Sequence, residues 1–180
     1  MILTDREIAI ALDTKQVIIE PRPPEDLLSS TAIDLRLHRS LKKWSPKKGM
    51  VIYPGGDEYS YNEIANTLCE VFDIGTGYIL KPKTFILGWT KEEVSLPSTS
   101  RLAARVEGKS SLARLGIGIH VTAPTIHAGF QGLIQLEIYN CGDLDIGLQA
   151  DMKICQLIFE QTLGTPDKGY RGIFTNQGAN

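Results

Sequence analysis

The chain has 180 residues, 42% of them hydrophobic and 22% charged, which is the composition of an ordinary globular protein. A chain of this length buries roughly 70% of its unfolded surface, so it can form a core without disulfides or metals. The net charge is −2 and no run of Lys or Arg exceeds two residues. This argues against nucleic-acid and membrane-surface binding, which need a concentrated basic patch. We expect one domain over residues 1–180.

The three cysteines form an odd, widely spaced set without a CxxC pair, so neither a disulfide framework nor a Cys-based zinc site is expected. Cys155 lies in the apolar run Ile154–Phe159 and is expected in the core. Charged residues occupy positions 5 to 7, where a signal peptide would be apolar, and no stretch of about 18 apolar residues occurs. We therefore expect a cytoplasmic protein.

The first third of the chain gives three local signals. Thr4 and Glu7 form a capping-box pattern, which predicts a short N-terminal helix. Alternating apolar and polar residues from Ala32 to Leu41 predict a half-buried strand. The polar, Gly-containing segment Trp44–Gly77 is predicted to be a loop-rich excursion.

Short apolar segments separated by turns follow, and their spacing of roughly 8–12 residues favours an antiparallel sandwich or barrel. The interruption at Gly108–Gly116 contains good helix formers and predicts one or two helical turns that end at Gly116. The predicted strands are Tyr78–Leu80, Phe85–Thr90, Ser100–Val106, Ile117–Val121, Leu133–Tyr139, Ile146–Leu148 and Ile154–Phe159.

The first candidate site follows Gly108. Lys109, Ser110 and Ser111 offer an ammonium group, two hydroxyls and the backbone N–H groups of a helix start, which together suit a polyphosphate. The segment is not a Walker A loop, because Ala103 stands where the first glycine would be. A capped surface helix is the alternative interpretation.

The second candidate lies in the strand LIQLEIYN, residues 133–140. Alternation places Gln135 and Glu137 on one face and apolar residues on the other. A strand Glu is usually a solvated edge residue, whereas partial burial would suit a group that takes and returns protons. Both interpretations of Glu137 stay open at this point.

The third candidate is the segment His120–Gly132. Gly129 and Gly132 bracket Phe130, which indicates a turn where backbone can approach a ligand and the ring can cover a flat face. Neither a nearby cysteine nor an HxE…PCxxC pattern accompanies His120 and His127. Hydrogen-bonding or core roles are therefore favoured over metal binding.

Together these segments resemble the deoxycytidine triphosphate deaminase family, a branch of the trimeric dUTP diphosphatase superfamily. The resemblance covers most of the chain outside about Trp44–Gly77, and the order and spacing of its motifs make it specific. The matching stretches are Met1–Asp5, Ser30–Leu37, Arg105–Gly116, His120–Gly132, Leu136–Asn140 and Met152–Phe159.

This resemblance implies a mostly β protomer, a distorted β-barrel or jelly roll of the dUTP diphosphatase type with short helices. It implies a homotrimer with active sites between subunits and a flexible C-terminal lid around residues 164–180. The implied reaction is hydrolytic, zinc-independent deamination of dCTP to dUTP and ammonia, in the supply of dUMP and dTTP. Mg²⁺ would enter only through the substrate triphosphate, and dTTP is a candidate feedback ligand.

The resemblance also implies roles for individual residues. Glu137 matches the general base, and Ser110 and Arg114 match the residues that orient its carboxylate and the attacking water. The Ala123 carbonyl would hold that water and the Gln135 backbone would read the pyrimidine edge. The implied substrate-binding set is Lys109, Ser110, Ser111, Ala123, His127, Phe130, Gln135, Tyr170 and Gln177.

The chain departs from the family pattern at three places. His127 replaces the usual Asp of Ile-Asp-Pro-Gly, and Thr125 stands where strictly deaminating members often carry Arg. Near the C-terminus Ile173-Phe174 occupies the place of Lys-Tyr, so Lys168 or Arg171 would have to substitute for the lid lysine. Two alternative functions therefore stay open: a bifunctional enzyme that forms dUMP and pyrophosphate, and a non-catalytic nucleotide-binding regulator.

Overall fold

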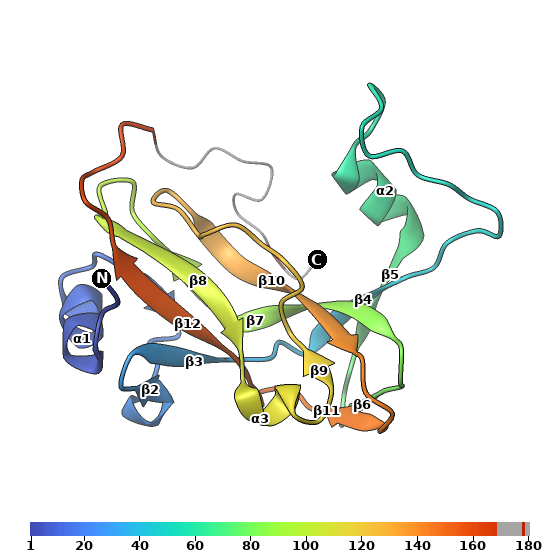
Figure 1. The fold of residues 1–180 in the computed structure, drawn as a ribbon, viewed down its shortest axis with the longest axis horizontal. Helices are drawn as coiled ribbons and strands as arrows, with labels where there is room; N and C mark the ends of the chain where they lie inside the picture. The colour runs from blue at the N-terminus through green and yellow to red at the C-terminus, as the bar shows by residue number, and fades with distance from the viewer. Residues whose placement is uncertain (169–177, 179–180) are drawn as a thin grey trace.

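The structure is a computed structural model that describes residues 1–168 and residue 178. Within this part of the chain, short helices flank a set of antiparallel sheets (Figure 1), and no helix is long and apolar enough to cross a membrane. The elements are α1 (Asp5–Asp13), β1 (Ile18–Glu20), the 3-10 helix η1 (Glu25–Leu27), β2 (Leu28–Ser29), β3 (Ala32–Arg36), β4 (Ser40–Trp44), α2 (Tyr61–Leu68), β5 (Cys69–Asp73), β6 (Tyr78–Leu80), β7 (Phe85–Ser95), β8 (Leu102–Gly108), α3 (Ser110–Ala113), β9 (Ile117–Gly118), β10 (Gln131–Asn140), β11 (Ile146–Leu148) and β12 (Lys153–Gln161).

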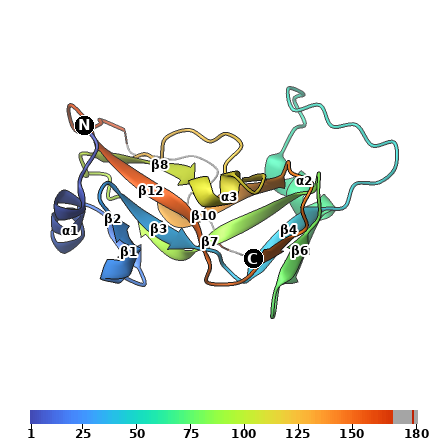
Figure 2. The same ribbon diagram turned by 60° about the horizontal axis from the view of Figure 1, so that its bottom comes forward.

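The strands of the described residues form three antiparallel sheets. The largest has the order β5-β4-β7-β10-β9, with β1 paired to β7 beside this path. A four-stranded sheet has the order β2-β3-β12-β8, and β6 pairs with β11. In both views α1 and α2 lie at opposite ends of the molecule (Figures 1 and 2). This arrangement confirms the predicted mostly β fold with short helices.

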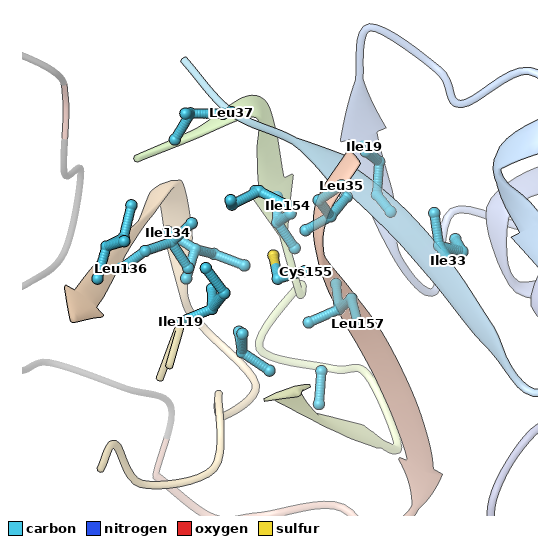
Figure 3. Packing of buried hydrophobic residues seen from close by; sticks show 14 of the residues in the cluster. Ile19, Ile33, Leu35, Leu37, Ile119, Ile134, Leu136, Ile154, Cys155 and Leu157 are labelled. Atoms are coloured by element: carbon cyan, nitrogen blue, oxygen red, sulfur yellow. The ribbon is translucent and has the colours of Figure 1, made fainter. Parts of the chain in front are cut away.

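The core lies between the two larger sheets. Ile33 and Leu35 of β3 and Leu157 of β12 have no exposed surface, and they gather with Leu136 of β10 in one cluster (Figure 3). Cys155 is also fully buried, as predicted, and this burial raises the pKa of its thiol far above the ordinary value. The cysteine therefore serves as a small apolar core residue.

The N-terminal helix and several strands occur where the sequence predicts them. Thr4 and Glu7 make the reciprocal capping-box contacts that start α1, and β6 and β11 have the predicted bounds. The predicted strand Ala32–Leu41 is wrong in one respect, because it is two strands, β3 and β4. At the break, the Leu37 N–H donates to Met152 O and the His38 N–H donates to Trp89 O. The chain thus crosses from the four-stranded sheet to the six-stranded one, a change of partner that local alternation does not encode.

The predicted loop-rich excursion Trp44–Gly77 is wrong in part, because it contains α2 and β5. Ser60 caps α2 by accepting a hydrogen bond from the Glu63 N–H at 3.4 Å. Only Ala65 and Leu68 of this helix are buried, so its apolar face is too short to stand out in a polar segment.

The predicted helical turns after Gly108 are α3, and the chain leaves them through Gly116 as expected. Gly116 has φ of +94°, a left-handed backbone conformation that a side chain disfavours. A Cβ atom built there would lie 2.5 Å from Cα and 2.6 Å from N of Gly142. Backbone packs directly on backbone at this point.

Gly116→Ala should therefore destabilise the protein by about 2–4 kcal/mol, because it adds a steric clash to an unfavourable φ. Gly49→Ala is the matched control: Gly49 has φ of +79° and nothing within 4 Å of the built Cβ. The control should cost only about 1 kcal/mol. Denaturant unfolding of both variants measures the difference, and equal losses would contradict the clash.

Candidate active site

A pocket of about 420 Å³ opens between β10, the loop before it and the start of α2. Its lining is mostly apolar, with a few polar groups, as is usual for small-molecule sites. The lining residues are Trp44, Tyr61, Phe85, Leu87, Thr122, Ala123, Pro124, Thr125, Ile126, His127, Phe130, Ile134, Gln135 and Glu137.

Glu137 supplies the carboxylate of this pocket. The alternation predicted for β10 is confirmed, since Leu136 and Ile138 are buried while Glu137 is partly exposed, with 27% of its side chain accessible. Its Oε2 atom is buried and, within the described part of the chain, has no hydrogen-bond partner. His120 is the nearest cation-forming group, with its Nδ1 atom 3.6 Å from Oε2. An acceptor in this state is suited to binding a water molecule.

The turn predicted around Phe130 is present and delivers two side chains to the pocket. The Phe130 N–H donates to His127 O at 3.1 Å, and Gly129 between them has φ of +93°, as in a type II turn. His127 is exposed and Phe130 is buried at the pocket wall. Ile126 anchors the preceding loop by pairing with Ala104 of β8 in both directions, at 2.6 and 3.0 Å.

One wall of the pocket comes from the excursion that the sequence analysis treated as a loop. Trp44 ends β4 and Tyr61 starts α2, and their rings meet edge to face with centroids 6.4 Å apart. Neither residue was among the predicted site residues. A signal was present, because Ser60 is followed by apolar residues at the helical spacing 61, 64, 65 and 68.

The cluster predicted after Gly108 lies elsewhere on the molecule. Ser110, Ser111 and Arg114 are exposed on or next to α3, which contacts β9. None of them is among the described residues that line the pocket of Glu137. The structure thus brings five of the predicted residues together in this pocket, but not the α3 group. The five are Ala123, His127, Phe130, Gln135 and Glu137.

Lys109 has a partner that the sequence analysis did not foresee. Its Nζ atom lies 2.6 Å from Asp34 Oδ1, and the two side chains are only 20% and 12% exposed. Gln156 Nε2 donates to the same oxygen at 3.1 Å, and Lys153 Nζ lies 3.8 Å from Asp34 Oδ2. The Asp34 carboxylate on β3 therefore links Lys109, which directly follows β8, to Gln156 of β12.

Three predicted lid positions, Tyr170, Arg171 and Gln177, lie outside the described residues. Lys168 is described and exposed. Within the described part of the chain, no cluster of three or more His, Cys, Asp or Glu side chains could hold a metal ion.

The fold and pocket define a mostly β protein whose largely apolar pocket carries the carboxylate of Glu137. The model of a protein family described as "dCTP deaminase-like" matches residues 2–162 of the chain. A dCTP deaminase of Marinomonas sp. (strain MWYL1) is 35% identical, covering 94% of this chain and 88% of its own. A relative from Halobacterium salinarum, named "dCTP deaminase, dUMP-forming", is also 35% identical, covering 94% and 85%. The chain belongs to the dCTP deaminase-like family.

Solved structures agree on the fold. The 2'-deoxycytidine 5'-triphosphate deaminase of Agrobacterium tumefaciens superposes with a TM-score of 0.67 and 22% identity, over 88% of this chain and 47% of that one. This chain thus spans about half the length of that solved chain. A dUTPase from phage phi11 of S. aureus superposes with a TM-score of 0.50 and 11% identity, over 87% of this chain and 97% of that one. These likenesses confirm the dUTPase-type fold that the sequence predicted.

Lys109→Ala should lower the free energy of unfolding by about 1–3 kcal/mol, because Asp34 loses its closest cationic partner in a mostly buried place. Adding Asp34→Asn should recover part of this loss, since the unpaired charge is then removed. Urea unfolding of the single and double variants measures the coupling. Strictly additive losses would mean that the ion pair contributes nothing to stability.

Proposed function

We propose that the protein is an enzyme that hydrolyses dCTP to dUTP and ammonia. The observation that carries the proposal is the buried Oε2 atom of Glu137, which accepts no hydrogen bond from the residues that the structure describes and lies in a pocket of about 420 Å³. Family membership supports the substrate, because relatives at 35–37% identity are named dCTP deaminases. A positioned carboxylate with an open acceptor is what activation of water requires.

The reaction follows from this placement. Glu137 accepts a proton from water as the water oxygen bonds to C4 of cytosine. Glu137 passes this proton to N3, which gives a tetrahedral intermediate. The proton of the new C4 hydroxyl then passes through Glu137 to the amino nitrogen, the C4–N bond breaks, and ammonia leaves. The water oxygen remains as O4 of uracil, so dCTP and water become dUTP and ammonia. The Ala123 carbonyl, at the pocket wall, is proposed to hold the water.

The rest of the proposed site needs a second copy of the chain. Ser110 and Arg114, assigned to orient Glu137 and the water, are exposed away from the pocket of their own protomer. Leu115 and Val121 flank this region and are 46% and 61% exposed, which suits a subunit interface. We propose a homotrimer in which α3 of one subunit completes the pocket of the next. Lys109, Ser110 and Ser111 would then bind the triphosphate.

The mechanism assigns no step to zinc, and Mg²⁺ is proposed to enter with the substrate phosphates. Phe130 is proposed to cover the sugar or base, and Tyr170 and Gln177 to belong to a lid over the phosphates. Regulation by dTTP and a cytoplasmic location also stay predictions.

A second candidate function is formation of dUMP and pyrophosphate from the same substrate. Two relatives, from Halobacterium salinarum and Methanobrevibacter smithii, are named "dCTP deaminase, dUMP-forming" at 35% and 36% identity. His127 lines the pocket where the resemblance implies an Asp that helps to activate water at phosphorus. Imidazole offers one acceptor, whereas carboxylate offers several. We therefore favour dUTP as the product.

Glu137→Gln should keep the fold and nucleotide binding but lose deamination by about 10²–10⁴-fold, because the amide cannot accept the proton from water. Ammonia release from dCTP measures the effect. Glu25→Gln, an exposed change in η1 outside the pocket, is the control and should stay active. Near-normal ammonia release by Glu137→Gln would refute the mechanism.

The products of the native protein decide between the two candidate functions. Given dCTP, it should release dUTP and ammonia with little pyrophosphate, and His127→Asp should raise pyrophosphate release if the rest of that site is present. Separate quantification of ammonia, dUTP, dUMP and pyrophosphate gives the answer. Stoichiometric dUMP and pyrophosphate from the native protein would favour the bifunctional enzyme.

A further inference from the structure

The excursion between β4 and β5 places a phenol hydroxyl against the catalytic strand. Tyr61, the first residue of α2, is half-buried, and its ring meets that of Trp44 at an interplanar angle of 73°. Both rings line the pocket of Glu137. This wall comes from the part of the chain that the family motifs leave out. Its side chains are therefore candidates for contacts that are particular to this protein.

Tyr61 makes a defined polar contact there. Its hydroxyl donates to Oε1 of Gln135 at 3.2 Å, joining residues 74 positions apart. Burial raises the pKa of Tyr61, and the nearby Cys69 and Glu137 raise it further, so the phenol is a donor at neutral pH. A carboxamide whose oxygen is engaged in this way presents its NH₂ group, which can only donate.

Gln135 stands beside the proposed catalytic carboxylate. It lies on the same face of β10 as Glu137, two residues and therefore about 6.8 Å along the strand. The pairing of β10 with β7 shifts register between Leu133 and Gln135, and there the buried Thr90 hydroxyl accepts from the Ile134 N–H at 2.9 Å. Such irregularities re-aim side chains next to active sites. The donor and the carboxylate consequently share one pocket.

The two bases that this pocket must distinguish differ at one edge. Cytosine carries acceptors at both N3 and O2, next to the amino group that is removed. Uracil carries a hydrogen on N3, so a fixed donor would face another donor there. A site that offers the wrong hydrogen-bonding group rejects a ligand more strongly than one that merely lacks a contact.

We propose that the Gln135 side chain determines specificity for cytosine, and that Tyr61 is a positioning residue that fixes its NH₂ group toward N3 and O2. The inference rests on the proposed deamination, and it adds a side-chain contact to the backbone reading that the resemblance implies. Its consequence is discrimination between substrate and product, because dUTP binds less well than dCTP and leaves once it is formed.

The test is Tyr61→Phe, which keeps the ring and removes the donor. The KM for dCTP should rise roughly fivefold, the worth of one neutral hydrogen bond. The inhibition constant of dUTP should not rise. The selectivity for dCTP over dUTP should therefore fall by the same roughly fivefold factor. Tyr53→Phe, in the same excursion but 76% exposed, is the matched control and should leave both constants unchanged. If Tyr61→Phe weakened the binding of dCTP and of dUTP equally, Tyr61 would have only a structural role and the proposal would be wrong.

A double-variant comparison separates action through Gln135 from any other effect of Tyr61. Gln135→Leu should lose the same selectivity, and Tyr61→Phe combined with Gln135→Leu should be no worse than Gln135→Leu alone. If the double variant instead lost selectivity by the product of the two single-variant factors, the two residues would act independently and the proposal would be wrong. Native ammonia release tests the deamination separately. Should the native protein bind dCTP without deaminating it, the dissociation constants of dCTP and dUTP in the same variants still decide the specificity.

Discussion

The buried carboxylate of Glu92 is the interaction on which the arrangement of the two main sheets depends. Glu92 is fully buried on β7 and accepts from both the backbone N–H of Arg36, at 2.8 Å, and its Nε, at 2.6 Å. Arg36 ends β3, so this pair joins the six-stranded sheet to the four-stranded one. A buried carboxylate is tolerated only when it is paired and hydrogen-bonded. Because the Glu92 carboxylate must remain hydrogen-bonded to Arg36, this pair fixes where the two sheets meet.

The same stretch of β7 also shapes β10, the strand that carries Glu137. Thr90 is fully buried, donates to Glu92 O at 2.8 Å and accepts from the Ile134 N–H where β10 changes register. Pairing with β7 on one edge therefore fixes both the position of β10 and the irregularity just before Gln135. This scaffold therefore fixes the position of Glu137, which suits its proposed role as general base because proton transfer needs a fixed geometry.

The pocket combines this rigid strand with walls of different origin. The loop that carries Ala123 and His127 is tied to β8 through Ile126 and Ala104. The opposite wall comes from Trp44 and Tyr61, in the part of the chain that resembles the family least. In many binding sites, rigid strands position the reacting group and connecting segments supply the contacts that determine specificity. The mostly apolar lining suits a base and the exposed hydroxyls of α3 suit phosphates, and in the proposed trimer these two regions would meet across subunits.

The sequence by itself determined much of the local structure and indicated the family. Alternation in residues 133–140 separated Glu137 from the apolar face of its strand, the Thr4 and Glu7 pattern located α1, and the ordered motifs indicated the family. These features are encoded within a few residues, where periodicity, capping and turn chemistry act. Only the tertiary structure decided that Ala32–Leu41 divides between two sheets, that Lys109 pairs with Asp34, and that Tyr61 reaches Gln135. Those contacts join residues 74 or more positions apart along the chain, or depend on which strand becomes a neighbour, and no local pattern carries that information.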